Sequence, residues 1–176
     1  EHIERAADEG CATIYASGIE PGFAGDQLPI VLCTLSNTIT SIRAQEIFDY
    51  ADYPNTFIMF EVFGFDQPLD YPAMMGVDGV QAMAWGPAIQ LVPHALGVEL
   101  DTITESYERA ATPRDLSVAA GTIAEGTCGA VRLQTTGIVD GKPIIVIEHI
   151  NRMAPDLAPH WPHAARDGTY RVIISG

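Results

Sequence analysis

The stretch from Cys11 to Phe23 reads Cys-Ala-Thr-Ile-Tyr-Ala-Ser-Gly-Ile-Glu-Pro-Gly-Phe. Its first half, Ala12 to Ala16, predicts a short buried strand. The residues from Gly18 to Gly22 predict a tight turn, after which Phe23 is expected to open a helix. Because α/β enzymes often build a ligand site where a strand leads through a glycine-rich turn into a helix, we expect this turn to border a ligand.

The two ends of the chain suggest part of a longer protein. Residues Glu1 to Glu9 resemble the second half of a surface helix, with Gly10 at its C-cap. The chain closes on a predicted strand from Thr169 to Ser175. We therefore expect another domain to precede Glu1.

The composition fits one domain with a substantial core. The chain has 176 residues, of which 47% are hydrophobic, and its mean hydropathy is +0.12. Its 23 acidic and nine basic residues give a net charge of −14. Such a surface repels nucleic acids and anionic membranes, so we expect neither as a partner, and it favours cationic small molecules.

The cysteines predict a reducing compartment. Cys11, Cys33 and Cys128 form no Cys-x-x-Cys pair, and their odd number argues against a disulfide framework. We expect each to be a small buried residue in a cytoplasmic protein. The apolar stretch from Val77 to Val98 includes polar residues and prolines, which favours a buried helix over a membrane span.

The order of predicted elements indicates an α+β fold, an open sheet with helices on one face. The Asp140-Gly141 pair is the strongest hairpin signal. After the first turn, the expected elements are a helix over 25–36, a strand over 38–50, a short helix over 55–65, a long buried helix over 73–97, strand-like runs over 99–111, 116–123, 127–139 and 142–153, and a strand over 170–174.

Two segments in the first two-thirds of the chain carry candidate site residues. The turn around Glu20 exposes backbone N–H groups to a ligand, or it only holds Phe23 in the core. Glu20 is a candidate acid, base or cation anchor, or a solvated turn carboxylate. His94 follows Pro93 on the predicted buried helix, where it either borders a pocket or is a core histidine.

Polar residues alternate along the end of the predicted strand 142–153. His149 and Asn151 are expected on one face of this strand, and Glu148 and Arg152 on the other. Arg152 either clamps a substrate carboxylate or pairs with Asp156.

The segment His160-Trp-Pro-His163 has two histidines at ligand spacing but no third ligand in a recognisable pattern, so we expect no metal. Trp161 is better interpreted as a lid or an interface anchor. The chain also lacks the G-x-G-x-x-G, Walker A, G-x-S-x-G and H-E-x-x-H motifs. It therefore contains no recognisable nucleotide-binding or hydrolytic centre of its own.

Three motifs resemble the C-terminal half of dihydrodipicolinate-reductase-like proteins. They are Tyr15 to Phe23, Ile150 to Met153, and the region from Ala158-Pro-His-Trp-Pro to the final Gly-Thr-Tyr-Arg-Val-Ile-Ile-Ser-Gly. The nearest branch is the group of 2,4-diaminopentanoate dehydrogenases and native amine dehydrogenases. The paired histidines and lysine of true dihydrodipicolinate reductases are absent, which argues against that activity.

The resemblance implies a fold, a cofactor and a reaction. It implies a C-terminal domain with an open mixed, largely antiparallel sheet, and an N-terminal Rossmann domain that binds NAD or NADP. Residues 1–17 are then the tail of the Rossmann domain, and residues 18–176 form a substrate-binding and dimerisation domain. The implied reaction is reversible oxidative deamination of an amine, catalysed by a homodimer, and this chain alone would be inactive.

The resemblance also assigns site residues. It places Gly18, Pro21, Gly22 and Phe23 beside the nicotinamide, whereas Glu20 stands where the family is expected to have a small amide. The candidate substrate-binding residues are Glu20, Phe23, His94, His149, Arg152 and Trp161. No catalytic residue is assigned, because the acidic residue that activates the amine is expected in the preceding domain.

Two other functions remain open. The same domain could be a non-catalytic sensor or assembly module, since it holds no complete catalytic set. Alternatively, a dehydrogenase of this fold could act on an aldehyde, a semialdehyde or a cyclic imine.

Overall fold

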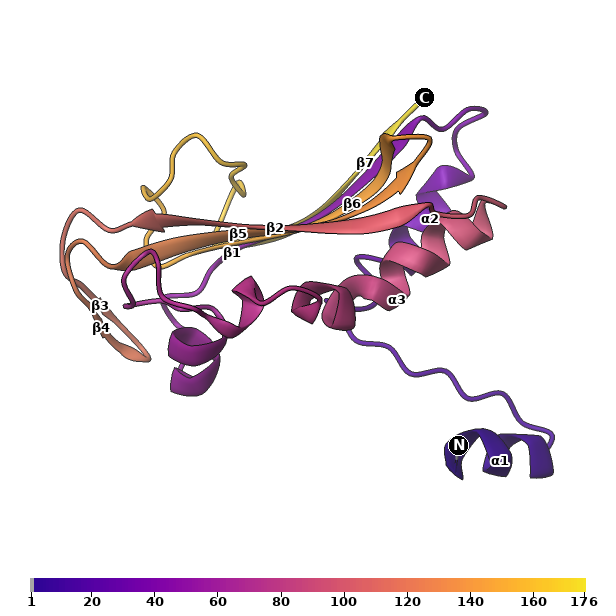
Figure 1. Ribbon diagram of the computed structural model, residues 1–176, viewed down its shortest axis with the longest axis horizontal. Coiled ribbons are helices and arrows are strands. Elements are labelled where there is room, and N and C mark those ends of the chain that lie inside the picture. Colours follow the sequence, from indigo (N-terminus) through magenta and orange to yellow (C-terminus); the bar gives the residue numbers. More distant parts are fainter. Residues whose placement is uncertain (1) are drawn as a thin grey trace.

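A computed structural model describes residues 2–176 and shows a layer of helices against one face of a five-stranded sheet (Figure 1). The strand order is β2-β5-β6-β1-β7, and only the β1–β6 pair is parallel. The strands are β1 (Ser41–Asp49), β2 (Thr102–Ala111), β5 (Cys128–Val139), β6 (Lys142–Arg152) and β7 (Gly168–Ser175). The predicted α+β fold with an open mixed, largely antiparallel sheet is confirmed.

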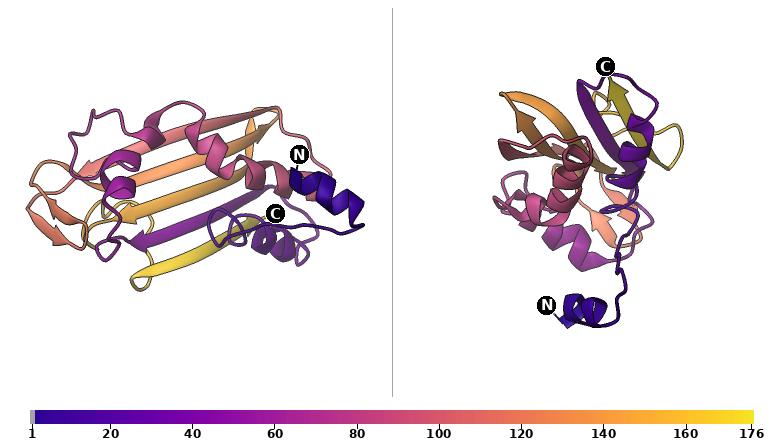
Figure 2. Two further views of the ribbon diagram at one scale, coloured as in Figure 1. Left: turned by 90° about the horizontal axis from the view of Figure 1, so that it is seen from below. Right: turned by 90° about the vertical axis from the view of Figure 1, so that its right-hand side faces the viewer.

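The helices lie on one side of this sheet, and the loop between β6 and β7 lies on the other (Figures 1 and 2). The helices are α1 (His2–Glu9), α2 (Gln27–Cys33), the π-helix η1 (Phe57–Val62), the short 3₁₀ helix η2 (Met74–Gly76) and α3 (Val80–Ala95). A separate hairpin joins β3 (Leu116–Val118) to β4 (Gly121–Ile123). No helix among residues 2–176 is long and apolar enough to cross a membrane.

The core forms where α3 covers the sheet. Trp85, Ala88, Ile89 and Val92 are buried on this helix, and α3 packs against β5 and β6. The helix begins where it does because Glu105 of β2 accepts hydrogen bonds from the backbone N–H groups of Gly79 and Ala82.

Several boundaries differ from the predictions. Ala12 to Ala16 is exposed coil and not a buried strand, since no described strand pairs with it. Phe23 lies in the turn, and α2 begins later, where Asp26 accepts a hydrogen bond from the N–H of Gln27. The predicted helix 73–97 divides into η2 and α3, and the run 116–123 is a hairpin.

The helix predicted at the start of the chain is confirmed for the described residues, and Glu1 lies outside them. Cys33 and Cys128 are buried as expected. Cys11 was expected to be buried but is exposed, because it lies beyond the end of α1 in the exposed connection to the sheet.

Candidate functional site

Glu46 is a carboxylate buried in the middle of the sheet. It lies on β1 with His149 of β6 on one side and Tyr170 of β7 on the other. Only 5% of its surface is exposed. Because side chains alternate along a strand, Glu46 shares with Ile42 and Ala44 the face that the helices cover.

A tyrosine and a histidine contact the Glu46 carboxylate. The hydroxyl of Tyr50 donates a hydrogen bond to Glu46 Oε1 at 2.9 Å, and His149 Nδ1 lies 3.3 Å from the same oxygen. The geometry leaves this ring nitrogen without a hydrogen-bond partner. Burial lowers the pKa of His149, although the charge of Glu46 opposes this shift, so the imidazole is neutral at pH 7.

Aromatic rings surround His149. Phe63 stacks on the imidazole with ring centroids 5.3 Å apart and planes 11° apart. Trp85 of α3 lies 5.4 Å from it, and Tyr50 packs edge-on at 6.0 Å. The indole N–H of Trp85 is buried and lies close enough to the Glu20 carboxyl to act on its pKa, so this aromatic wall includes a polar donor.

The turn that contains Glu20 brings a second carboxylate to the same side of the sheet. Gly18 accepts a hydrogen bond from the backbone N–H of Phe23, and Ile19 accepts one from Ala24. Gly22 has a φ of 141°, and a Cβ there would collide with the backbone of Gly18, so this position requires glycine.

The Glu20 side chain packs against Gly25 and approaches the sheet. A Cβ on Gly25 would lie 3.1 Å from Glu20 Oε2 and 3.5 Å from Ile147 Cδ1. One Glu20 oxygen is fully buried without a hydrogen-bond partner. Burial, together with the charges of Glu46 and Asp26, raises the pKa of Glu20 to about 8, although the nearby indole of Trp85 opposes the rise.

The two carboxyls lack a cationic partner. Among residues 2–176, His149 is the only basic side chain within ion-pair distance of Glu46 or Glu20, and it is neutral. Burial and the charges of Glu46 and Glu20 also raise the pKa of Tyr170 to about 12. The site therefore carries negative potential without compensation and is suited to bind a cation.

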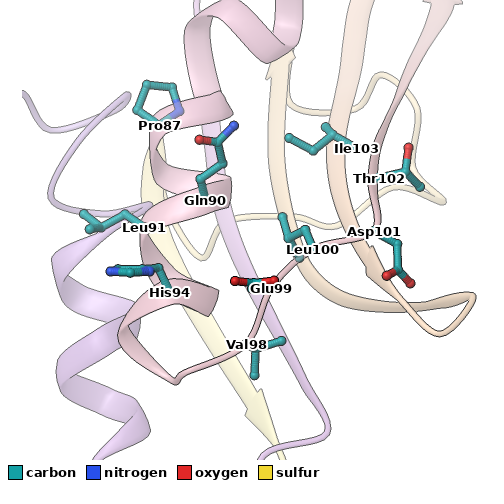
Figure 3. A pocket seen from close by; sticks show the side chains of 10 residues that line it. All are labelled: Pro87, Gln90, Leu91, His94, Val98, Glu99, Leu100, Asp101, Thr102 and Ile103. Carbon is teal, nitrogen blue, oxygen red and sulfur yellow. The ribbon is translucent and has the colours of Figure 1, made fainter.

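The structure places Glu20 and His149 on the helix-covered face, where Trp85 lies close to both. It separates His94 from them, because His94 is exposed at the end of α3. Figure 3 shows it across from Glu99, Leu100 and Asp101, in a groove of about 640 Å³. Of the two predicted alternatives, the core histidine was wrong, and His94 instead borders this groove, apart from Glu20 and His149. It lies nine residues after the buried Trp85. At about 3.6 residues per turn this spacing puts His94 on the opposite side of the helix.

Arg152 and Trp161 also lie apart from this cluster. Arg152 points to the other face of the sheet, as the alternation predicted, and donates to the carbonyls of Leu157 and Ala158. Trp161 is buried beside it, with the guanidinium 5.9 Å from the ring centroid. The suggested Arg152–Asp156 pair is not formed, because Asp156 binds Arg114 at 2.7 and 2.8 Å.

Glu46, Tyr50 and Tyr170 were not among the predicted site residues. One signal was available for Glu46, since it continues the alternating series of Ile42 and Ala44 and so places a charge on an apolar face. Phe23, expected either in the core or at the site, is 45% exposed in the turn. No group of three or more potential metal ligands occurs within the described residues.

Residues 23–161 match the model of the 2,4-diaminopentanoate dehydrogenase C-terminal domain. The chain belongs to this family. It is also 44% identical, over 97% of its length, to an amine dehydrogenase from Streptomyces virginiae. The domain is thus one of an oxidoreductase family, and the predicted resemblance is confirmed.

A solved structure agrees on the fold. The amine dehydrogenase from Mycobacterium smegmatis superposes with a TM-score of 0.70 over 94% of this chain at 11% identity. The chain spans 48% of the Streptomyces protein and 46% of the Mycobacterium protein, so about half of each relative has no counterpart in it.

Proposed function

We propose that this chain is the substrate-binding part of an NAD(P)-dependent oxidoreductase that interconverts an amine with its ketone and ammonia. The observation that carries the proposal is the buried carboxyl of Glu46 beside the half-buried Glu20, both without a cationic partner among the described residues and next to aromatic rings. An amine is a natural ligand for such a site because its ammonium form supplies the missing charge. The amine dehydrogenases among the relatives support the same reaction.

The turn beside the site fits one end of a nicotinamide dinucleotide. Ile19 and Phe23 flank Glu20 with 52% and 45% of their surfaces exposed, and they offer an apolar contact to a ring. The segment from Cys11 to Phe23 has no basic residue to hold phosphates, so a preceding Rossmann domain would bind the rest of the cofactor. When bound, the nicotinamide accepts a hydride from the carbon that bears the amine.

The reaction requires proton transfers that residues of this site can provide. Loss of the hydride and use of the nitrogen lone pair leave a C=N⁺ group, to which water adds before ammonia leaves. Overall, amine, water and oxidised cofactor give ketone, ammonia, reduced cofactor and one proton. Because its pKa is about 8, Glu20 is ionised in part near that pH, and its ionised form can accept the proton of the bound ammonium and return it in the reverse direction.

Other side chains hold the Glu46 carboxyl in place. The Tyr50 hydroxyl donates to it, and its own pKa is raised by burial and by the charge of Glu46, so the tyrosine remains a donor. The neutral imidazole of His149, stacked on Phe63, fills the space beside the carboxylate.

The test uses the protein that carries this chain together with its N-terminal domain. We expect it to oxidise NAD(P)H in the presence of ketones and ammonium, and Glu20→Gln to lower kcat by about 100-fold or more. The exposed Glu61, which accepts a hydrogen bond from Tyr71, provides the control substitution Glu61→Gln with unchanged kcat. Tight ligand binding without any turnover would contradict the proposal and would favour a sensor.

Two further proposals concern the assembly. We expect a homodimer that uses the sheet face opposite the helices, in a protein of the cytoplasm. Light scattering that shows a monomer for the longer protein would contradict the homodimer. Sedimentation of the protein with a membrane fraction would contradict the cytoplasmic location.

A further inference from the structure

Among the described residues, the strands place no arginine or lysine side chain next to Glu20 or Glu46. They place one arginine, Arg109, on the helix-covered face, and it lies on β2, three strand positions from β1. Its guanidinium donates to the carbonyl of Tyr71 at 2.7 Å and stacks 4.8 Å from the ring centroid of Tyr107. The side chains of Arg43, Arg132, Arg152 and Arg171 lie on the opposite face.

This distribution of charge disfavours a substrate carboxylate. The family is named for 2,4-diaminopentanoate, a substrate that carries a carboxylate. In this chain such a group would meet Glu46 and Glu20 and would find no arginine or lysine among the described residues of the site. Because a second carboxylate beside the buried carboxyl of Glu46 would be repelled, such a substrate would be rejected.

The site has one more acid than the reacting amine requires. The nitrogen of that amine must be unprotonated when hydride leaves, because its lone pair forms the C=N bond. If Glu20 holds the released proton, Glu46 still carries an uncompensated charge with 5% exposure. A cation that keeps its proton throughout the reaction would compensate this charge.

The walls around Glu46 suit an alkylammonium group. Tyr50, Phe63 and Trp85 surround the neighbouring imidazole, and Tyr170 lies opposite Glu46 on β7. Aromatic faces attract ammonium ions, and they bind the methylene groups between two amines. The polar atoms that face these rings are few, namely the Trp85 indole N–H on the Glu20 side and His149 Nδ1, which lies 3.3 Å from Glu46 Oε1.

We propose that the preferred substrate is a diamine without a carboxylate, whose second, non-reacting ammonium group binds Glu46. This rests on the proposed oxidoreductase function. It assigns to Glu46 the choice of substrate, whereas Glu20 serves the proton transfer.

The test compares three amines with the same five-carbon chain in the oxidative direction. They are 1,4-diaminopentane, 2-aminopentane and 4-aminopentanoate, which carry an ammonium, a methyl and a carboxylate at the far end. With the longer protein, we expect kcat/KM to be at least 10-fold higher for the diamine than for the monoamine, and lower still for the amino acid. The variant Glu46→Gln should remove the preference for the diamine, whereas the exposed control Glu61→Gln should keep it.

A binding measurement gives a readout independent of turnover. We expect 1,4-diaminopentane, and not 4-aminopentanoate, to raise the Tm of the protein, and Glu46→Gln to abolish this rise. Equal kcat/KM for the first two amines, or a preference for the amino acid, would overturn the inference while leaving the oxidoreductase function intact. Failure to oxidise any of the three would instead overturn the function. If Glu46→Gln does not fold, the order of kcat/KM for the three amines with the wild-type protein tests the inference.

Discussion

Two buried carboxylates on neighbouring strands have opposite surroundings. Glu148 of β6 lies on the face away from the helices, where Arg43 and Arg132 bind it at 3.0 and 2.6 Å and Gln45 and Gln134 donate to it. Glu46 of β1 lies on the helix-covered face without a cationic partner. The same chemical group thus has cationic partners on one face and none on the other.

The pKa shifts follow this difference. Burial alone would raise the pKa of Glu148, but the hydrogen bonds of Gln45 and Arg132 and the charges of two arginines bring it below its ordinary value. On the other face, burial and the charge of Glu46 raise the pKa of Glu20 to about 8. Both faces hold a buried acid, so burial does not separate them. The absence of a cationic partner does, and it is the better indicator of a functional site here.

The largest effect is expected from Glu148→Leu. The substitution leaves Arg43 and Arg132 without their shared acceptor, and it should lower the free energy of unfolding by about 3–5 kcal/mol. Urea unfolding measures this loss. The matched variant Glu108→Gln changes only the partly exposed, longer contact of Arg132 at 3.4 Å and should cost far less. A loss below about 1 kcal/mol for Glu148→Leu would show that the arginines around Glu148 contribute little, and the two carboxyls would then not differ in their role in stability.

Glu46→Gln should have a much smaller effect on stability. The amide keeps the shape of the side chain and an acceptor for Tyr50, and it removes a charge that no cation compensates. We expect the free energy of unfolding to stay within about 1 kcal/mol of wild type or to rise. Destabilisation as large as that of Glu148→Leu would show that Glu46 is a structural acid.

The two acids also predict opposite pH effects. Between pH 4.5 and about 8, folded Glu20 keeps a proton that the unfolded chain releases, so its contribution to stability falls as pH rises. Glu148, with its lowered pKa, contributes stability that is lost as pH falls through the acid range.

Thermal unfolding can separate these contributions. We expect Glu20→Gln to raise the Tm relative to wild type at pH 8 by roughly 3 °C or more, and to have little effect at pH 4. Equal effects at both pH values would mean that Glu20 is ionised in the folded protein.

The smallest effect is expected at the exposed pair of Arg114 and Asp156. Its geometry is good, with two hydrogen bonds of 2.7 and 2.8 Å, but both side chains are about half exposed. Water screens such a pair, so Arg114→Ala should leave the Tm unchanged within error. A clear fall in Tm would show that the loop after β6 depends on this contact.

The sequence predicted most of the sheet and only part of the site. The Asp140-Gly141 turn and the alternation of β6 identified the hairpin and the two faces of His149 and Arg152, because these are local properties. Glu46 was missed because its importance depends on pairing with β6, about 100 residues later in the chain. Likewise, the orientation of His94 depends on how α3 packs, which a uniformly apolar helix does not reveal.

Glu148 and His149 are consecutive residues of β6, so the register of this strand decides which face of the sheet each one occupies. Since consecutive residues of a strand face opposite ways, sliding β6 by one position would exchange them, bringing a third acid to the helix side and an imidazole to the arginines. A single-residue insertion or deletion in the Asp140-Gly141 turn that moved this register would therefore disable folding and ligand recognition together. We expect the length of that turn to tolerate less variation than its surface position suggests.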